Sequence, residues 1–322
     1  MAEALGSNLL SPIILSFALG VFAGLARSDL TIPESVGKAI AVYLMFAIGL
    51  KGGLAAAASS FTPTLVLTFA AGLVLSFGLP LLAYFLLRTI VGIPRLDAAA
   101  ISAHYGSISV VTFVTGAEIL QGSGVSYEGY LVAVLALMET PAIMTGMWLA
   151  RRKSTGRGDG FDRDLMREVF LNGSVVLLVG GFVIGWITGP AGMAKVLPFF
   201  KVPFSGVLCL FLLDMGLLAA RRLSNAEGMG LRLVAFGFAM PLIGGTIGVL
   251  LGTGAGLSVG GATLLGVLAG SASYIAVPAA MRLAIPEANP ALSLTLALAI
   301  TFPFNVVAGI PLYWTGAAWL GG

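Results

Sequence analysis

The sequence predicts an all-α integral membrane protein with ten transmembrane helices in two inverted five-helix repeats. Three observations predict this fold. First, 58% of the 322 residues are hydrophobic and only 10% are charged, with a mean hydropathy of +1.02, whereas soluble domains carry roughly 25% charged residues. Second, apolar segments of about 20 residues, the length that spans a bilayer, recur along the chain. Third, Lys and Arg divide unequally between alternate connections.

Ten segments are apolar enough, and long enough, to cross a bilayer. The one clearly hydrophilic connection, 151–164, leaves five segments on each side. We therefore divide the chain into a first inverted repeat, 1–150, a cytoplasmic linker, 151–167, and a second inverted repeat, 168–322. The segments lie near 9–26, 35–52, 62–88, 97–120, 129–150, 168–188, 204–220, 231–253, 260–283 and 290–317.

The basic residues predict the orientation, because Lys and Arg accumulate in cytoplasmic connections. With the linker inside, 14 Lys and Arg residues are cytoplasmic and three, Lys51, Lys195 and Lys201, are outside. We expect Lys51 to extend toward the outer interface. The start of the chain lacks the positive region of a cleaved signal peptide. We expect a multi-pass protein of the inner (plasma) membrane, surrounded by lipid, with both termini on the periplasmic side.

Four short matches between the two halves indicate the repeat. Their offsets are nearly constant, from 161 to 167 residues, which four unrelated matches would not share. Inverted repeats are characteristic of secondary transporters, which bind substrate near the midplane where the repeats meet. The matches pair Gly20 and Gly24 with Gly181 and Gly185, 47–55 with 214–220, 106–109 with 270–273, and 138–141 with 300–303.

Two polar stretches interrupt the fourth and ninth segments and predict two discontinuous helices. A helix breaks inside a membrane only where protein or a water-filled cavity satisfies its freed backbone groups. The half-helix that resumes offers free N–H groups and a positive dipole end, which suit an anion. Small residues can instead serve only close helix packing, but the symmetric pairing favours a binding site. The candidate substrate-binding residues are His104, Gly106, Ser107, Ser109, Gly270, Ser271, Ser273 and Tyr274.

Few ionisable residues lie deep in the apolar segments. A carboxylate at depth is costly and is often functional, so Glu139 is a candidate for binding a coupling cation or for a structural hydrogen bond. Pro141 follows it and leaves a carbonyl without its helical partner. We interpret Asp214 as structural. The candidate sodium ligands are Ser109, Glu139, Ser273 and Asn305.

His104 and Tyr274 have two interpretations each. His104 can relay protons or donate to an anion, or it can be a satisfied core residue. Tyr274 can bond a solute or plug the cavity.

The composition excludes several classes of function. One cysteine, Cys209, and one histidine exclude a disulfide framework and a Cys/His metal cluster. No phosphate-binding GxxxxGK[ST] motif occurs, and the net charge of +3 reflects topology rather than nucleic-acid binding. A single histidine without an evident acid and nucleophile makes an intramembrane enzyme a poor interpretation. We expect no enzyme activity and no cofactor besides a coupling ion.

Four stretches carry a resemblance to a known family: 48–54, Gly106-Ser107, Met138-Glu139-Thr140-Pro141-Ala142, and R-x-x-I-P-x-A-N-P over 282–290. With them, the sequence resembles the sodium-dependent bicarbonate transporter family known from cyanobacteria, over nearly its whole length. The resemblance implies a core domain that slides against a gate domain, commonly in a homotrimer. It implies bicarbonate at the crossing of spans four and nine, with Na⁺ beside it. A cytosolic PII-like protein regulates some members.

One position departs from the family pattern. Cyanobacterial members have an aspartate after the second serine run, where this sequence has Tyr274, and we expect Asn305 to supply an oxygen instead. The predicted function is uptake of a small monovalent anion, bicarbonate, by sodium symport with elevator-type alternating access. The alternative is a proton-coupled carrier of another small carboxylate or anion that uses Glu139 and His104. A sensor or scaffold is a further alternative, against which the lack of a soluble output domain argues.

Overall fold

The computed structural model describes residues 11–57, 62–151, 171, 173–224, 229–275 and 277–321. Within these ranges all regular secondary structure is helical. Eight helices are long and apolar enough to cross a membrane, and Pro12–Leu25 and Val259–Ala269 are shorter apolar helices. The prediction of an all-α membrane protein is therefore confirmed. Apart from Arg151, the predicted linker 151–167 lies outside the described residues.

The helices follow the predicted segments closely. In the first half they are α2 (Pro12–Leu25), α3 (Glu34–Ala57), α4 (Pro63–Leu86) with the π-helical turn η1 (Leu87–Val91), α5 (Arg95–Gly106), α6 (Val110–Gly122) and α7 (Leu131–Arg151). In the second half they are α9 (Gly173–Met193), α10 (Leu197–Lys201), α11 (Phe204–Ser224), α12 (Leu231–Gly254), α13 (Val259–Ala269), α14 (Val277–Ala284), α15 (Pro290–Thr295), η2 (Leu296–Thr301), α16 (Phe302–Phe304), η3 (Asn305–Gly309) and α17 (Ile310–Gly321).

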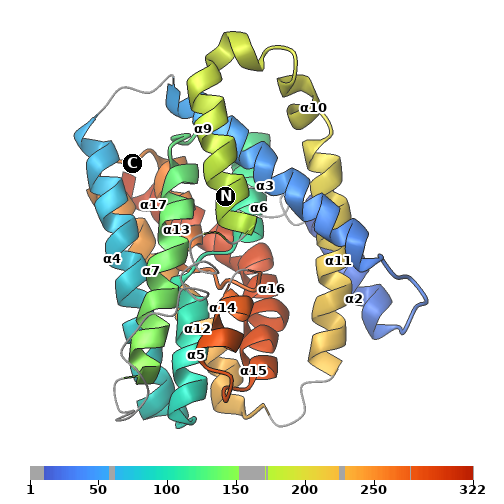
Figure 1. Ribbon diagram of the computed structural model, residues 1–322, viewed down its shortest axis with the longest axis vertical. Coiled ribbons are helices and arrows are strands. Elements are labelled where there is room, and N and C mark those ends of the chain that lie inside the picture. Colours follow the sequence, from blue (N-terminus) through green and yellow to red (C-terminus); the bar gives the residue numbers. More distant parts are fainter. Residues whose placement is uncertain are drawn as a thin grey trace.

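The long helices pack in two sets. The α3 group contains α2, α3, α9 and α11, in which α2 packs along α11 and α3 packs along α9. The α5 group contains α4 to α7 and α12 to α17, in which α4, α5 and α7 contact one another, as do α12, α13 and α17. Figure 1 shows α4 and α7 on one side of the molecule and α2, α10 and α11 on the other. Each set therefore contains helices from both halves of the chain.

Glycines let the helices of the α3 group touch through their backbones. A Cβ added to Gly20 of α2 would lie 3.1 Å from the Cα of Gly216 in α11, and one added to Gly49 of α3 would lie 3.1 Å from the Cα of Gly181 in α9. Gly20 matches Gly181 in the internal repeat, and Gly49 matches Gly216. The glycines matched in the sequence therefore lie at two similar helix crossings, of the close kind that small residues permit in membranes.

The segment 282–290, which contains the R-x-x-I-P-x-A-N-P motif, positions the starts of two helices. Asn289 caps α15, since its side chain accepts a hydrogen bond from the Ala291 N–H at 3.0 Å, and Pro290 occupies the first helical turn. The Asn289 N–H donates to Asp97 Oδ1 at 2.7 Å. Because Asp97 lies in the first turn of α5, this connection holds the N-terminal end of one broken helix in place.

Candidate functional site

The structure confirms that the fourth and ninth segments are broken. α5 ends at Gly106, and α6 begins at Val110. Ser109 is the N-cap of α6, and its side chain accepts a hydrogen bond from the Thr112 N–H at 3.2 Å, as serine commonly does at a helix start. α13 ends at Ala269, and α14 begins at Val277. The serines of both breaks are buried.

The two breaks meet and are joined by hydrogen bonds. The Ser109 N–H donates to Ser271 Oγ at 2.9 Å, and the Ser271 hydroxyl donates in turn to the Leu268 carbonyl at 2.9 Å. The Ser273 N–H donates to the His104 carbonyl at 2.8 Å. The His104 ring also pairs through Nδ1 with the Ser273 carbonyl. Hydrogen bonds therefore join the two predicted substrate-binding stretches, and His104 takes part in two of these contacts.

Each break glycine lies against a proline inside a neighbouring long helix. A side chain at Gly106 would collide with the ring of Pro80 in α4. A Cβ on Gly270 would lie 2.9 Å from the Pro241 carbonyl of α12 and 2.6 Å from the Tyr313 hydroxyl. Glycine is needed at both breaks for this close approach. Pro80 and Pro241 were not among the predicted site residues, although they lie 161 positions apart, at the repeat offset, within apolar segments.

A small cavity lies where the breaks cross. Its volume is about 10 Å³, near the least that holds one water molecule, so the lining closes tightly around it. It is lined by Ile108, Ser109 and Val110 from the first break, Ser273, Tyr274 and Ile275 from the second, Glu139 from α7 and Ser174 from α9. Three predicted site residues, Ser109, Glu139 and Ser273, are thus brought together. Ser174 is an addition that its place after the polar linker could have suggested.

Several polar atoms at this crossing are buried without a partner. Glu139 is 1% exposed, and neither its Oε2 atom nor Ser107 Oγ forms a hydrogen bond within the described residues. The buried Tyr274 hydroxyl has no hydrogen bond of good geometry either, and Ser109 is the polar side chain beside it. Buried polar atoms in proteins nearly always have partners. These atoms are therefore available to a ligand.

Asn305 is not brought to this cavity. Its side-chain N–H donates to the Gly270 carbonyl at 2.8 Å, and its Oδ1 atom lies 2.9 Å from the Tyr313 hydroxyl, which donates. Both ends of the amide therefore support the end of α13. Asp214 is likewise absent from the lining: a Cβ on Gly37 of α3 would lie 2.8 Å from Asp214 Oδ2, so this aspartate packs on a backbone within the α3 group.

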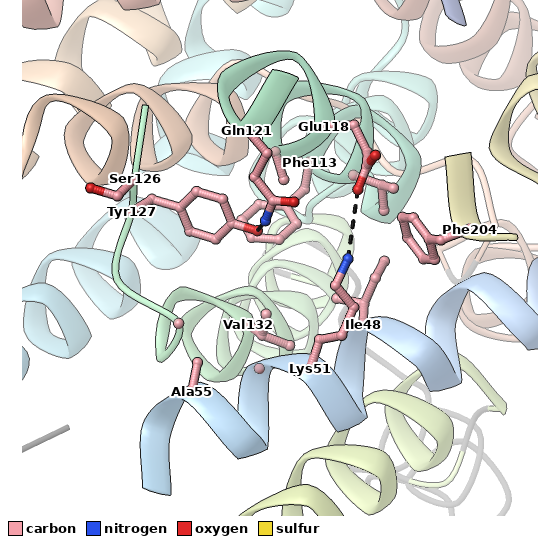
Figure 2. A pocket seen from close by; sticks show the side chains of 14 residues that line it. Ile48, Lys51, Ala55, Phe113, Glu118, Gln121, Ser126, Tyr127, Val132 and Phe204 are labelled. Atoms are coloured by element: carbon pink, nitrogen blue, oxygen red, sulfur yellow. Dashed lines mark hydrogen bonds and ion pairs between the residues drawn. The ribbon is translucent and has the colours of Figure 1, made fainter. Parts of the chain in front are cut away.

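A larger cavity, which we call the outer cavity, lies toward the C-terminal end of α6. Its volume is about 290 Å³, and α3, α6, α7, α11 and the connection after α6 line it. Figure 2 shows Lys51 of α3 directed toward Glu118 of α6, with Nζ 3.6 Å from Oε1. Lys51 was expected to extend toward the outer interface, but it pairs with Glu118 instead. Its Nζ also lies 4.2 Å from the centre of the Phe204 ring, within the range of a cation–π contact.

The opposite wall of the outer cavity is polar. The Gln121 side chain donates to the Tyr127 hydroxyl at 2.8 Å (Figure 2). Burial raises the pKa of Tyr127 to about 12, and the charge of Glu118 acts in the same direction. Tyr127 therefore stays neutral at physiological pH and keeps its hydroxyl hydrogen.

Shared lining residues connect the outer cavity to the crossing of the breaks. Val114 lines both the outer cavity and a small cavity between α3, α6 and α11. Val110 and Ile275 line that small cavity and the one at the breaks. The three cavities therefore follow one another along α6, from its C-terminal end to its N-terminus.

Comparison with known proteins agrees with this arrangement. A family model described as the Na⁺-dependent bicarbonate transporter superfamily matches residues 12–318. A search of curated proteins finds no match. The family match includes both helix breaks, Glu139, Ser174 and the residues of the outer cavity. A match over this much of the chain shows that the protein belongs to the Na⁺-dependent bicarbonate transporter superfamily.

Proposed function

We propose that this protein takes up bicarbonate by symport with Na⁺, and that both ions bind where the two helix breaks cross. Membership of a transporter family supports transport in general. The observation that carries the specific proposal is the buried Glu139 Oε2 atom, which has no partner among the described residues and belongs to a residue that lines the cavity at the breaks.

The anion would bind at the helix starts. α6 and α14 both begin beside the cavity, and a helix N-terminus favours negative charge through its free N–H groups and dipole. The free Ser107 hydroxyl adds a donor. No lysine or arginine lines this cavity in the part of the chain that the structure describes. The site therefore suits a small monovalent anion better than a multiply charged one.

The cation would bind on the Glu139 side. The carboxylate and the hydroxyls of Ser109, Ser174 and Ser273 line one cavity, and hard cations prefer oxygen ligands of this kind. An unpaired carboxylate is expensive to bury, and a bound Na⁺ would neutralise it. The cation would also neutralise the anion beside it, which is a physical reason for the two ions to bind together.

Transport would proceed by movement of the α5 group relative to the α3 group. The breaks and Glu139 belong to the α5 group, whereas only Ser174 comes from the α3 group. The proposal includes ten spans in two inverted repeats, with the α5 group as core and the α3 group as gate. It also includes periplasmic termini, a homotrimer and a cytosolic PII-like regulator.

Proton coupling is the second candidate, and the same atom supports it. A carboxyl group that carries a proton would also leave one oxygen without a partner, so Glu139 could load a proton in place of Na⁺. Uptake measurements separate these candidates.

The test is uptake of radiolabelled bicarbonate into proteoliposomes that contain the full-length protein, at alkaline pH, where little CO₂ diffuses. We expect uptake to require an inward Na⁺ gradient and to stop when choline replaces Na⁺. Uptake that instead follows an inward proton gradient without Na⁺ would favour the second candidate. No bicarbonate uptake under either gradient would overturn the proposed substrate.

A further inference from the structure

We infer that the outer cavity is a second binding site, which takes bicarbonate before it reaches the helix breaks and which selects small oxyanions that carry an acidic hydrogen. The inference rests on the proposed function, because it assigns an outer site to the same substrate. It is carried by four features of the outer cavity: the spacing of Lys51 and Glu118, the anchoring of Glu118, the solvent-exposed mouth, and the row of cavities leading inward.

The ammonium group of Lys51 has donors to spare. Its 3.6 Å separation from Glu118 Oε1 exceeds the 2.7–3.2 Å range of an N–H···O hydrogen bond. The Phe204 ring contacts the same ammonium group without accepting a conventional hydrogen bond. The Lys51 side chain is 24% exposed, so the charge is partly shielded from bulk water. A ligand oxygen in the outer cavity can therefore accept a hydrogen bond from a positive charge.

The carboxylate of Glu118 determines which anion fits. Its Oε2 atom is held by the Ser205 hydroxyl at 2.6 Å, which leaves Oε1 facing Lys51. An ionised carboxylate only accepts hydrogen bonds and repels another anion. A ligand in the cavity that contacts both side chains must therefore accept from Lys51 and donate to Glu118. Bicarbonate does both, through a carboxyl-like oxygen and its own hydroxyl, whereas chloride and nitrate have no hydrogen to donate.

The outer cavity is placed on a route to the breaks. Gln121 and Ser126 at its mouth are exposed, and Phe113 and Val114 at its other end are buried. Val114 also lines the small cavity between α3, α6 and α11. Val110 lines that small cavity too, and together with Ser109 it lines the cavity at the breaks. The 290 Å³ of the outer cavity exceeds the 10 Å³ of each inner cavity. A hydrated anion can therefore enter the outer cavity while the inner ones are closed.

The experiment measures bicarbonate uptake and its inhibition by external nitrate in proteoliposomes that contain the full chain. We expect Lys51→Gln to raise KM about tenfold with kcat unchanged, because a hydrogen bond to a charged group is lost. We expect Glu118→Gln to make nitrate about five times or more potent as an inhibitor, because the repelling charge is gone. Lys195→Gln, which removes an exposed charge between α9 and α10, is the matched control and should change neither quantity.

Lys51→Arg guards against a folding defect, since it keeps the charge and should restore KM to within about twofold of the wild type. An unchanged KM in Lys51→Gln, or unchanged nitrate potency in Glu118→Gln, would overturn the outer site. The proposed function fails separately. Wild-type protein that transports no bicarbonate, yet binds it in calorimetry through Lys51, would overturn the symport proposal and retain the outer site.

Discussion

The Ser109 N–H donates a hydrogen bond to the Ser271 hydroxyl across 2.9 Å, so that residues 162 positions apart hold the two helix breaks together. We expect Ser271→Ala to leave this buried N–H unsatisfied, at a cost of about 1–3 kcal/mol. Both the melting temperature and bicarbonate uptake should fall. Ser102→Ala is the control, because the hydroxyl of that buried serine donates within its own helix, to the Ala99 carbonyl. Equal effects of the two substitutions would contradict a special role for the link between the breaks.

Glu139→Gln should separate stability from coupling. The neutral amide is cheaper to bury than an unpaired carboxylate, so we expect the melting temperature of the variant to be equal to or above that of the wild type. Uptake should fall by about tenfold or more and lose its dependence on Na⁺, because the charged ligand is absent. Uptake assays with and without a Na⁺ gradient check this prediction. Persistent Na⁺ dependence would show that the cation binds elsewhere.

Tyr274→Phe tests whether this tyrosine binds a solute or only closes the cavity. The substitution removes the hydroxyl and retains the edge-to-face contact with Phe302, at a centroid distance of 5.6 Å. Because that hydroxyl is buried without a well-formed hydrogen bond to any described residue, we expect its loss to raise the KM for bicarbonate about fivefold without lowering the melting temperature. An unchanged KM would leave Tyr274 as a plug.

Gly49→Ala should destabilise the α3 group. The new methyl would lie 2.6 Å from the Leu178 carbonyl oxygen and 3.0 Å from the Phe182 amide nitrogen, so α3 and α9 must separate, at a cost of about 1–3 kcal/mol. Gly78→Ala is the matched control within α4, because no atom of the described residues lies within 4 Å of its added methyl. Thermal unfolding in detergent compares the two variants. A Gly49→Ala protein as stable as Gly78→Ala would contradict the backbone contact.

Tyr127→Phe should change how stability depends on alkaline pH. Burial raises the pKa of Tyr127 from its ordinary value of 10.0 to about 12, so between those values the folded protein keeps a proton that the unfolded chain loses. Stability from this group is therefore complete below pH 10 and declines as the pH rises toward 12. The variant should lack this part of the decline. Parallel stability curves for the two proteins across this pH range would show that Tyr127 is not buried in the folded state.

Much of the fold could be predicted because lipid imposes simple rules. Helix length and apolar composition located the helices. Gly106-Ser107 and Gly270-Ser271 marked the breaks, because few polar residues occur within membrane-spanning segments without a structural reason. The contact of Gly20 with Gly216 could not be predicted, because internal alignment shows which residues are equivalent and not which ones touch. The ten-span topology and the periplasmic location of the two termini remain predictions.

The site was predicted less completely, because side-chain partners depend on tertiary packing. Serine and glutamate could be placed near the midplane from their positions in the apolar segments, and Ser109, Glu139 and Ser273 do line one cavity. Asn305 was predicted beside them but is held by Gly270 and Tyr313, a pairing that spacing does not reveal. Ser174 was missed because only its place after the polar linker distinguishes it from other serines in apolar segments.

The hydrogen bonds from Ser109 to Ser271 and from Ser273 to His104 also bear on the direction of transport. Because these bonds hold the two helix breaks together, a bicarbonate ion would contact the same hydrogen-bond donors whether it arrived from the periplasm or from the cytoplasm. Its intrinsic affinity would then be nearly equal on the two sides. Such a carrier is reversible, and net flow follows the combined electrochemical gradient of its ions, so that a reversed Na⁺ gradient would drive efflux.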